Sequence, residues 1–155
     1  MTVKLDHPIP DFRVPATSGK DILFSALKGY KVVLYFYPKD DTPGCTMEGQ
    51  DFAARYDHFK ATKTIIFGIS RDSLEAHEKF KCKHVFPFEL ISDKNEALCK
   101  LFDVIKAKNM YGKIVQGVER STFLFDENGI LRREWRKVTV KGHADEVLNA
   151  ARNIG

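Results

Sequence analysis

Apolar residues in this chain occur in short unbroken runs, separated by longer segments with helical spacing. The longest run, KVVLYFYP at residues 31–38, is almost wholly β-branched or aromatic. Such a run is typical of a strand buried on both faces, which favours a parallel or mixed sheet. TKTIIFGIS at residues 62–70 predicts a second buried strand, and FPFELIS at residues 86–92 predicts a third, shorter one.

Helical spacing follows the first run, over residues 44–60. There Cys45, Phe52, Tyr56 and Phe59 lie within about 60° of one face, at about 100° per residue. Further helices are predicted over residues 70–84, 93–102 and 142–154, and the last of these is amphipathic. For the helix at 93–102, Asp93 or Asn95 is the expected N-cap.

A hairpin is predicted near the C-terminus, because DENG separates two strand-like runs at residues 122–125 and 130–135. Near the N-terminus, residues 11–16 predict a short extended segment, and residues 21–30 a strand that runs into one helical turn. Strands that alternate with helices and then end in a hairpin and a helix predict an α/β fold. We expect one domain over residues 1–155, with a central mixed sheet flanked by helices.

Composition and charge limit the classes of partner and the location expected for this chain. The chain is 43% hydrophobic and 30% charged, as in globular proteins, and its net charge of +4 comes from interleaved residues. This balance does not call for nucleic acid or a membrane as a partner. No apolar run reaches the length of a membrane span, and the N-terminus lacks the apolar core of a signal peptide. We therefore expect a cytoplasmic protein.

The chain has three cysteines, at positions 45, 82 and 99. An odd number without a signal peptide argues against a structural disulfide framework. No pair has the C-x-x-C spacing of a dithiol or a zinc ribbon. His84 follows Cys82 by two residues, but no second pair completes a metal site, so no metal is expected.

Cys45 lies where PKDDTPGC passes from a strand into a helix, which places it in the first helical turn. The free N–H groups and partial positive charge of a helix N-terminus favour a thiolate. Gly44 leaves room for a ligand to approach the backbone, and Pro43 fixes the loop. These features suit a nucleophilic sulfur, and equally a half-buried structural cysteine after an ordinary threonine cap.

The same stretch resembles the active-site motif of the peroxiredoxins. Pro38, Thr42 and Cys45 have the spacing P-x-x-x-T-x-x-C directly after an apolar strand, and DDTPGCTxE resembles the PrxQ branch, also called bacterioferritin comigratory protein. The likeness continues through GISRDS, FPFELISD, KNMYGK and ERSTFLFDENG to the C-terminal helix. It implies a thioredoxin-like fold with an N-terminal extension.

The resemblance also implies a role for each matching residue. Cys45 would attack a hydroperoxide and become a sulfenic acid. The hydroxyl of Thr42 would bind the peroxide, and Pro38 would shield the sulfur. Arg120 would hold the thiolate and polarise the peroxide, oriented by Glu48. Donors aimed at the leaving oxygen stabilise its developing charge. Because sulfur carries both electrons, no cofactor is required.

Recycling of the sulfur is where the sequence departs from a common family pattern. Many members carry a resolving cysteine five residues after the first, where this chain has Gln50. Others carry it in the next helix, near Lys81, and here Cys82 is one residue away. We expect Cys82 to resolve Cys45, with thioredoxin as reductant. The alternative is a one-cysteine enzyme reduced by glutathione or glutaredoxin. The resemblance favours a monomer, and helical spacing makes Cys99 a core residue.

Two other classes remain open from the residues alone. A cysteine hydrolase or acyltransferase would also use such a thiolate, but would need a histidine base close to Cys45. We expect His7, His58, His77 and His143 to be surface or locally bonded groups. A non-catalytic thioredoxin-fold binding module would not need Thr42, Glu48 and Arg120 beside the cysteine.

Overall fold

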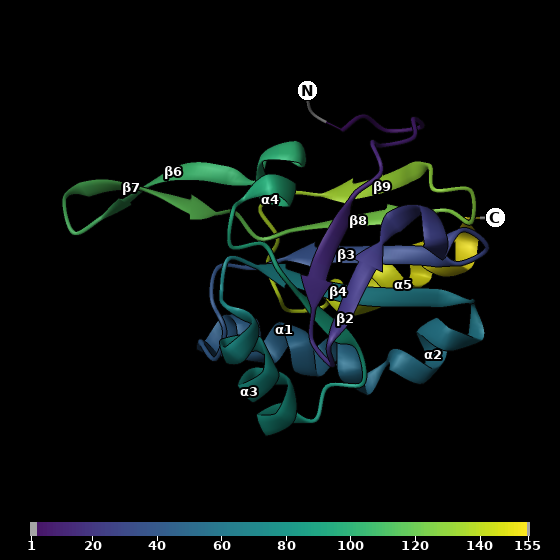
Figure 1. Cartoon of the computed structure of the whole chain (residues 1–155), viewed down its shortest axis with the longest axis horizontal. Helices are drawn as coiled ribbons and strands as arrows, with labels where there is room; N and C mark the ends of the chain where they lie inside the picture. Colours follow the sequence, from purple (N-terminus) through teal and green to yellow (C-terminus); the bar gives the residue numbers. More distant parts are fainter. Residues whose placement is uncertain (1–2, 155) are drawn as a thin grey trace.

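A seven-stranded mixed sheet forms the centre of the computed structural model, which describes residues 3–154 (Figure 1). Its strand order is β2-β1-β5-β4-β3-β8-β9, and β5, β4 and β3 are parallel while the other pairs are antiparallel. The strands are β1 (Arg13–Ala16), β2 (Lys20–Leu23), β3 (Lys31–Phe36), β4 (Thr64–Ser70), β5 (Glu89–Ser92), β8 (Ser121–Phe125) and β9 (Leu131–Trp135). The mixed sheet predicted from the apolar runs is confirmed.

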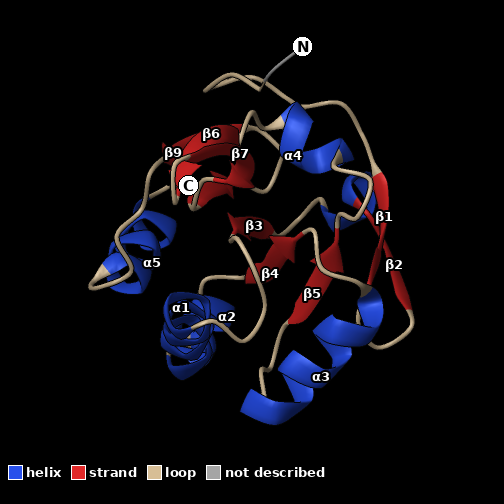
Figure 2. Ribbon diagram, turned by 90° about the vertical axis from the view of Figure 1, so that its left-hand side faces the viewer, coloured by secondary structure: helices blue, strands red, loops and turns tan. Residues whose placement is uncertain are grey.

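Helices cover both faces of this sheet. They are η1 (Phe24–Leu27), α1 (Pro43–Ala54), α2 (Tyr56–Ala61), α3 (Leu74–His84), α4 (Ala97–Leu101) and α5 (His143–Asn153). Four of them, α1, α2, α3 and α5, lie on one face, and α4 lies on the other (Figure 2). In residues 3–154, no helix has the length and apolar character needed to cross a membrane.

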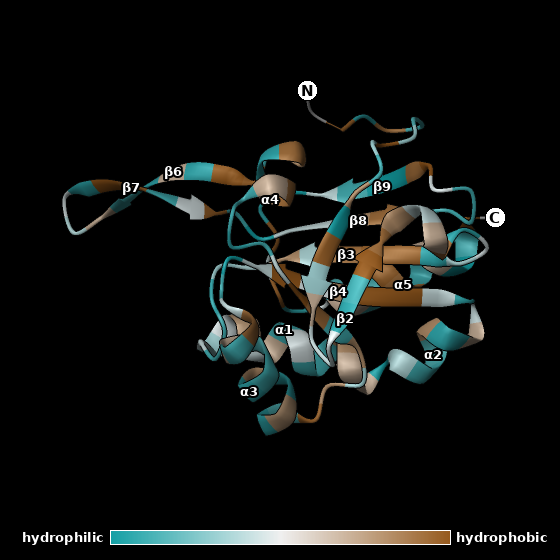
Figure 3. Cartoon of the chain, viewed as in Figure 1, coloured by the Kyte–Doolittle hydropathy of each residue, from teal (hydrophilic) through white to brown (hydrophobic). Residues whose placement is uncertain are grey.

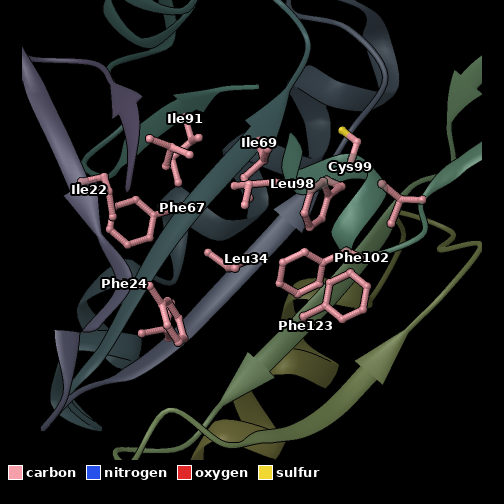
Figure 4. Close-up of a cluster of buried hydrophobic side chains, with 14 of the residues drawn as sticks. Ile22, Phe24, Leu34, Phe67, Ile69, Ile91, Leu98, Cys99, Phe102 and Phe123 are labelled. Atoms are coloured by element: carbon pink, nitrogen blue, oxygen red, sulfur yellow. The ribbon is translucent and has the colours of Figure 1, made fainter. Parts of the chain in front are cut away.

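The central strand β3 is buried on both faces, as its unbroken apolar pattern predicts. Alternate side chains enter opposite cores because successive residues of a strand point to opposite faces. Val33 and Tyr35 join the core under α1, whereas Leu34 and Phe36 join the core under α4 (Figure 4). Figure 3 shows the neighbouring strands as similarly apolar, and the helices around them as more polar. The core under α4 also contains Cys99, which confirms that prediction.

Three of the predicted helices differ from the structure at their boundaries. The helix predicted over 70–84 begins only at Leu74, because Ser70 is the last residue of β4. The helix expected over 44–60 is divided into α1 and α2, because the chain makes a turn at Arg55. Its predicted inner face is still kept, since Phe52 and Phe59 are buried. At α4 the capping residue is Glu96, later than predicted. Asp93 nevertheless accepts hydrogen bonds from two of that helix's backbone N–H groups.

A second hairpin, β6 (Ile105–Met110) with β7 (Lys113–Val118), was not predicted. It extends away from the main sheet (Figure 1), so most of its side chains are exposed and no buried face marks it in the sequence. Its two-residue turn, Tyr111 and Gly112, has positive φ at both positions, as this tight hairpin turn requires. The tyrosine there gives a weaker turn signal than asparagine or aspartate would.

Candidate functional site

Cys45 is the third residue of α1, directly behind the loop that leaves β3. Thr42 is extended, with φ −92° and ψ 156°, and Pro43 starts the helix, where its missing N–H costs nothing. The first-turn N–H groups therefore have no partner within the helix. Cys45 itself is only 2% exposed. The predicted position of the cysteine is confirmed, and the sulfur is held among core side chains.

Arg120 reaches this sulfur from the junction between β7 and β8, 75 residues along the chain. Its Nη2 donates to Cys45 Sγ at 3.5 Å, and its Nη1 donates to Glu48 Oε1 at 2.6 Å. Glu48 lies three residues after Cys45 on α1, so the two side chains share a face of the helix. One guanidinium therefore joins the thiol and the carboxylate, and the structure brings together three of the predicted site residues.

The glycine before the cysteine makes room for a protein side chain. A Cβ built on Gly44 would lie 3.1 Å from Arg120 Nη2. The space beside this glycine is therefore occupied by the guanidinium, while the approach of a ligand to the backbone stays a prediction. Any side chain at this position would push the arginine away from the sulfur.

Burial and charge have opposing effects on the pKa values of Glu48 and Arg120. Burial raises the pKa of Glu48 to about 7, against the opposing effect of Arg120. Arg120 loses hydration too, but the negative charges of Glu48 and Cys45 outweigh that loss and raise its pKa. The pair thus keeps the guanidinium of Arg120 charged, whereas burial favours the neutral form of Glu48. Among residues 3–154, Glu48 Oε2 is buried with no hydrogen-bond partner, while Oε1 accepts from the guanidinium.

Glu48→Gln should therefore alter how stability depends on pH. The folded chain holds the Glu48 proton up to about pH 7, whereas the unfolded chain releases it near the usual 4.5. Stability from this group is present below pH 4.5 and is lost as pH rises to about 7, by roughly 3 kcal/mol. Glu48→Gln should lack that decline.

The measurement is urea unfolding between pH 4.5 and 8. Glu134→Gln, which changes a glutamate that pairs with Arg136 at the protein surface, is the matched control. It should keep the wild-type decline. If Glu48→Gln follows the wild-type profile, Glu48 is not the group that titrates.

Thr42 and Pro38 lie in the active-site loop, which we define as residues 37–42. The hydroxyl of Thr42 donates to the carbonyl of Lys39 at 2.8 Å and makes no capping bond to the helix. Its oxygen keeps lone pairs that can accept a hydrogen bond. Pro38 is half-buried at the start of the same loop. Both residues are on the segment that carries the chain to Cys45.

The two aspartates before the cysteine are held by other partners. Asp40 accepts a hydrogen bond from Tyr37 at 2.7 Å and contacts His77 at 2.7 Å. Asp41 accepts from Lys83 at 2.8 Å, and this bond lowers the pKa of its carboxyl group. Each carboxylate thus has nearby cations or donors of its own, which offset its repulsion of a thiolate at Cys45.

Histidine positions require a correction. His77 and His143 were expected to be surface or locally bonded, but both are buried. His77 contacts Asp40, 37 residues away, and His143 shares a hydrogen bond with Thr122 at 2.8 Å. Within residues 3–154, no histidine hydrogen-bonds to Cys45, so the base that a cysteine hydrolase or acyltransferase needs is missing from the sulfur.

One cluster in the described part of the chain could geometrically hold a metal ion, and no sequence spacing pointed to it. It consists of Asp40, Asp72 and His77. Asp72 accepts hydrogen bonds from the backbone of Asp40 and from Ser70. The side chains of Asp40 and His77 therefore already bind each other, and Asp72 is bound by the Asp40 backbone and by Ser70.

The other two cysteines lie in contrasting places. Cys82 is exposed near the C-terminal end of α3, where it borders a surface pocket with Val85 and Phe86. Cys99 is fully buried, and burial raises the pKa of its thiol well above the usual range. All three cysteines are free thiols. Only Cys82 therefore presents its sulfur to solvent.

Comparison with known proteins agrees with this arrangement. The sequence model of the AhpC/TSA family matches residues 5–134. The protein named peroxiredoxin Bcp from Xanthomonas campestris is 51% identical over 148 residues, which cover 94% of this chain and 92% of that protein. The solved Xanthomonas campestris bacterioferritin comigratory protein, described for its alkyl peroxide reduction activity, has a TM-score of 0.87 and 50% identity, covering 91% and 90% of the two chains. The PrxQ structure from Xylella fastidiosa has a TM-score of 0.93 and 38% identity, covering 98% and 97%.

Proposed function

Because this chain belongs to the AhpC/TSA family and is a peroxiredoxin of the Bcp and PrxQ branch with a thioredoxin-like fold, we propose that Cys45 reduces hydroperoxides and is then recycled by a thiol reductant. The observation that carries this proposal is the guanidinium of Arg120, which bridges the sulfur and Glu48. A fixed cation against a helix-N-terminal sulfur stabilises a thiolate, the form that attacks.

The chemical step follows from these positions. The Cys45 thiolate attacks one oxygen of the hydroperoxide, a sulfur–oxygen bond forms and the O–O bond breaks. The sulfur becomes a sulfenic acid, and the leaving alkoxide or hydroxide takes a proton to become an alcohol or water. The negative charge that builds on the leaving oxygen is stabilised by Arg120 and by the N–H groups of the first turn of α1.

Thr42 and Pro38 are proposed to complete the pocket. The hydroxyl of Thr42 donates to Lys39, so its oxygen can accept the hydrogen of the peroxide O–OH group. That contact would hold this hydrogen-bearing oxygen against the sulfur, so that the other oxygen leaves as the alkoxide or hydroxide. Pro38, half-buried beside the apolar end of β3, would limit the access of water. We propose hydrogen peroxide and organic hydroperoxides as substrates, in keeping with the alkyl peroxide reduction described for the Xanthomonas relative.

Cys82 is proposed to resolve the sulfenic acid. Its thiolate would attack the Cys45 sulfur, so that an S–S bond forms while the S–O bond breaks, and the leaving hydroxide takes a proton from solvent to become water. Because Cys45 is buried and Cys82 is exposed, the end of α3 must move before the two sulfurs meet. Two features favour that motion. The helix buries only His77 and Phe80, and its C-cap Val85 has a φ of +55°, which is strained for a β-branched residue.

The other apolar side chains in the first turns of α3 add little to its anchoring. Leu74 is exposed and Ala76 only half-buried. Phe80 is therefore the one apolar side chain that this helix buries fully, with the polar His77 beside it.

We predict that Cys82→Ser leaves the first turnover intact and blocks recycling by thioredoxin, so that sulfenic acid accumulates on Cys45. The measurement combines steady-state peroxide consumption with trapping of the sulfenic acid by dimedone. Cys99→Ala is the matched control and should behave as wild type, because Cys99 lies in the opposite core. Equal steady-state turnover by wild type and Cys82→Ser would favour the one-cysteine mechanism instead.

We propose thioredoxin as the reductant. A dithiol protein such as thioredoxin can reduce a Cys45–Cys82 disulfide by exchange. A reducing compartment such as the cytoplasm suits a chain with three free thiols. Hydroperoxide consumption should be assayed with thioredoxin and its reductase, and separately with glutathione and glutaredoxin. If the chain consumes hydroperoxide with neither system, the proposed function is contradicted. If it is more active with glutathione and glutaredoxin, these are the reductant in place of thioredoxin.

A further inference from the structure

The buried pair His77 and Asp40 joins α3 to the active-site loop. His77 is fully buried, and the side chain of Asp40 is 7% exposed. His77 Nδ1 lies 2.7 Å from Asp40 Oδ2, and its Nε2 lies 2.9 Å from the carbonyl oxygen of Ile91 on β5. A carbonyl only accepts, so Nε2 carries a hydrogen, and one further proton is shared between Nδ1 and the carboxylate. The ring thereby fixes α3 to both the loop and the sheet.

Asp40 in turn is held by two further hydrogen bonds within and beside the active-site loop. Its other carboxylate oxygen accepts from Tyr37 at 2.7 Å, and its backbone N–H donates to Asp72 at 2.9 Å. The next residue, Asp41, has a φ of +60°, a conformation that costs energy outside glycine. The loop needs such support because it presents Thr42 and then Cys45 to the substrate.

A second set of contacts between α3 and the loop is weaker. Lys83 and His84 contact Asp41 at 2.8 and 3.3 Å, but Asp41 and Lys83 are exposed. Exposed ion pairs contribute little to stability, whereas breaking a buried pair leaves a polar group without a partner and costs far more. The buried pair is therefore the strongest polar link between the two segments, and it lies where the ring of Tyr37 packs near His77 and Phe80.

We propose that His77 is a positioning residue, which acts through Asp40 as a latch: it holds the active-site loop in place for Cys45 oxidation and holds α3 closed. Loss of the latch should have opposite effects on two steps. Oxidation of Cys45 should slow because the loop loses its geometry. Disulfide formation should become faster because α3 opens more readily, and this second effect rests on the proposed resolving role of Cys82.

Two substitutions at one position separate the latch from simple packing. In His77→Asn, the side-chain nitrogen can occupy the place of Nδ1 and keep the bond to Asp40. In His77→Gln, it reaches the place of Nε2, so the variant keeps the bond to Ile91 and loses the latch. His84→Gln, on the same helix, is the control for the exposed contacts to Asp41.

The test is quench-flow oxidation of these variants by hydrogen peroxide, with mass spectrometry of the Cys45 peptide and hydrogen exchange of the α3 backbone. We expect His77→Gln to oxidise between about ten- and about a hundredfold more slowly, with faster exchange in α3, as a small displacement near the reacting groups would cause. His77→Asn and His84→Gln should stay close to wild type. If His77→Gln does not fold, Asp40→Ala breaks the same contact beside a surface pocket that water can fill, and it should show the same slow oxidation.

Equal oxidation rates in all variants would overturn the latch. So would a greater loss in His77→Asn than in His77→Gln, because packing or the Ile91 contact would then be decisive. If the wild-type chain consumes peroxide but forms no Cys45–Cys82 disulfide, the resolving role fails while the oxidation rates still decide the latch. If the wild-type chain consumes no peroxide, the proposed function itself fails.

Discussion

Cys45→Ser should abolish hydroperoxide reduction while the fold survives. Serine differs from cysteine by one atom, and its hydroxyl can accept the hydrogen bond from Arg120 that the sulfur accepts. The neighbouring core side chains keep their contacts. The hydroxyl, however, is scarcely ionised at neutral pH and is a poor nucleophile toward oxygen, so the rate should fall by several orders of magnitude.

Two measurements are needed for this variant. Circular dichroism and urea unfolding should show a folded chain of near wild-type stability, and a peroxide-consumption assay should show no turnover with any thiol donor. Cys99→Ala is the control for removal of a buried sulfur, and should retain activity. Substantial turnover by folded Cys45→Ser would contradict the assignment of the nucleophile.

Arg120→Ala should slow the oxidation of Cys45 much more than the later reduction of the oxidised enzyme. The guanidinium is a donor aimed at the reacting atoms, and removing one such donor costs about 2.7–4 kcal/mol, or about 10²- to 10³-fold in rate. Reduction by an external thiol uses other groups. Rapid mixing with peroxide, followed by quenching and mass spectrometry, measures the first step alone.

Arg120 also stabilises the fold, so the experiment must separate this structural role from its role in oxidation. Without Arg120, the buried Glu48 loses the one hydrogen-bond partner of its carboxylate, which destabilises the fold or leaves the group protonated. The double variant Arg120→Ala with Glu48→Gln removes both members of the buried Arg120–Glu48 pair, so it leaves no unpaired carboxylate and separates chemistry from stability. An oxidation rate equal to wild type in the folded double variant would remove the arginine from the mechanism.

The parts of this structure that the sequence predicts are those encoded by neighbouring residues. The burial of β3 on both faces is predicted by one unbroken apolar run. The positions of Thr42, Cys45 and Glu48 follow from a loop and a single helical turn. Arg120 was placed beside them only by family resemblance, because no periodicity relates residues 75 positions apart.

Features that depend on long-range contacts, or that have no apolar pattern, were missed. The His77 contact with Asp40 joins two polar residues that each look like surface groups in their own segments. The hairpin of β6 and β7 lacks a buried face, so it has no apolar alternation to detect. Gly44 was correctly seen as a place for close approach, but sequence alone does not say that the approaching group is a protein side chain.

One measurement tests the central claim most directly. The reduced protein is treated with an equimolar amount of hydrogen peroxide in the presence of dimedone, digested, and examined peptide by peptide by mass spectrometry. The account predicts that the oxidation is confined to Cys45, either as a dimedone adduct of its sulfenic acid or as a disulfide with Cys82, while Cys99 remains a free thiol. Peroxide consumption with Cys45 left as a free thiol, or first oxidation at Cys82, would contradict it.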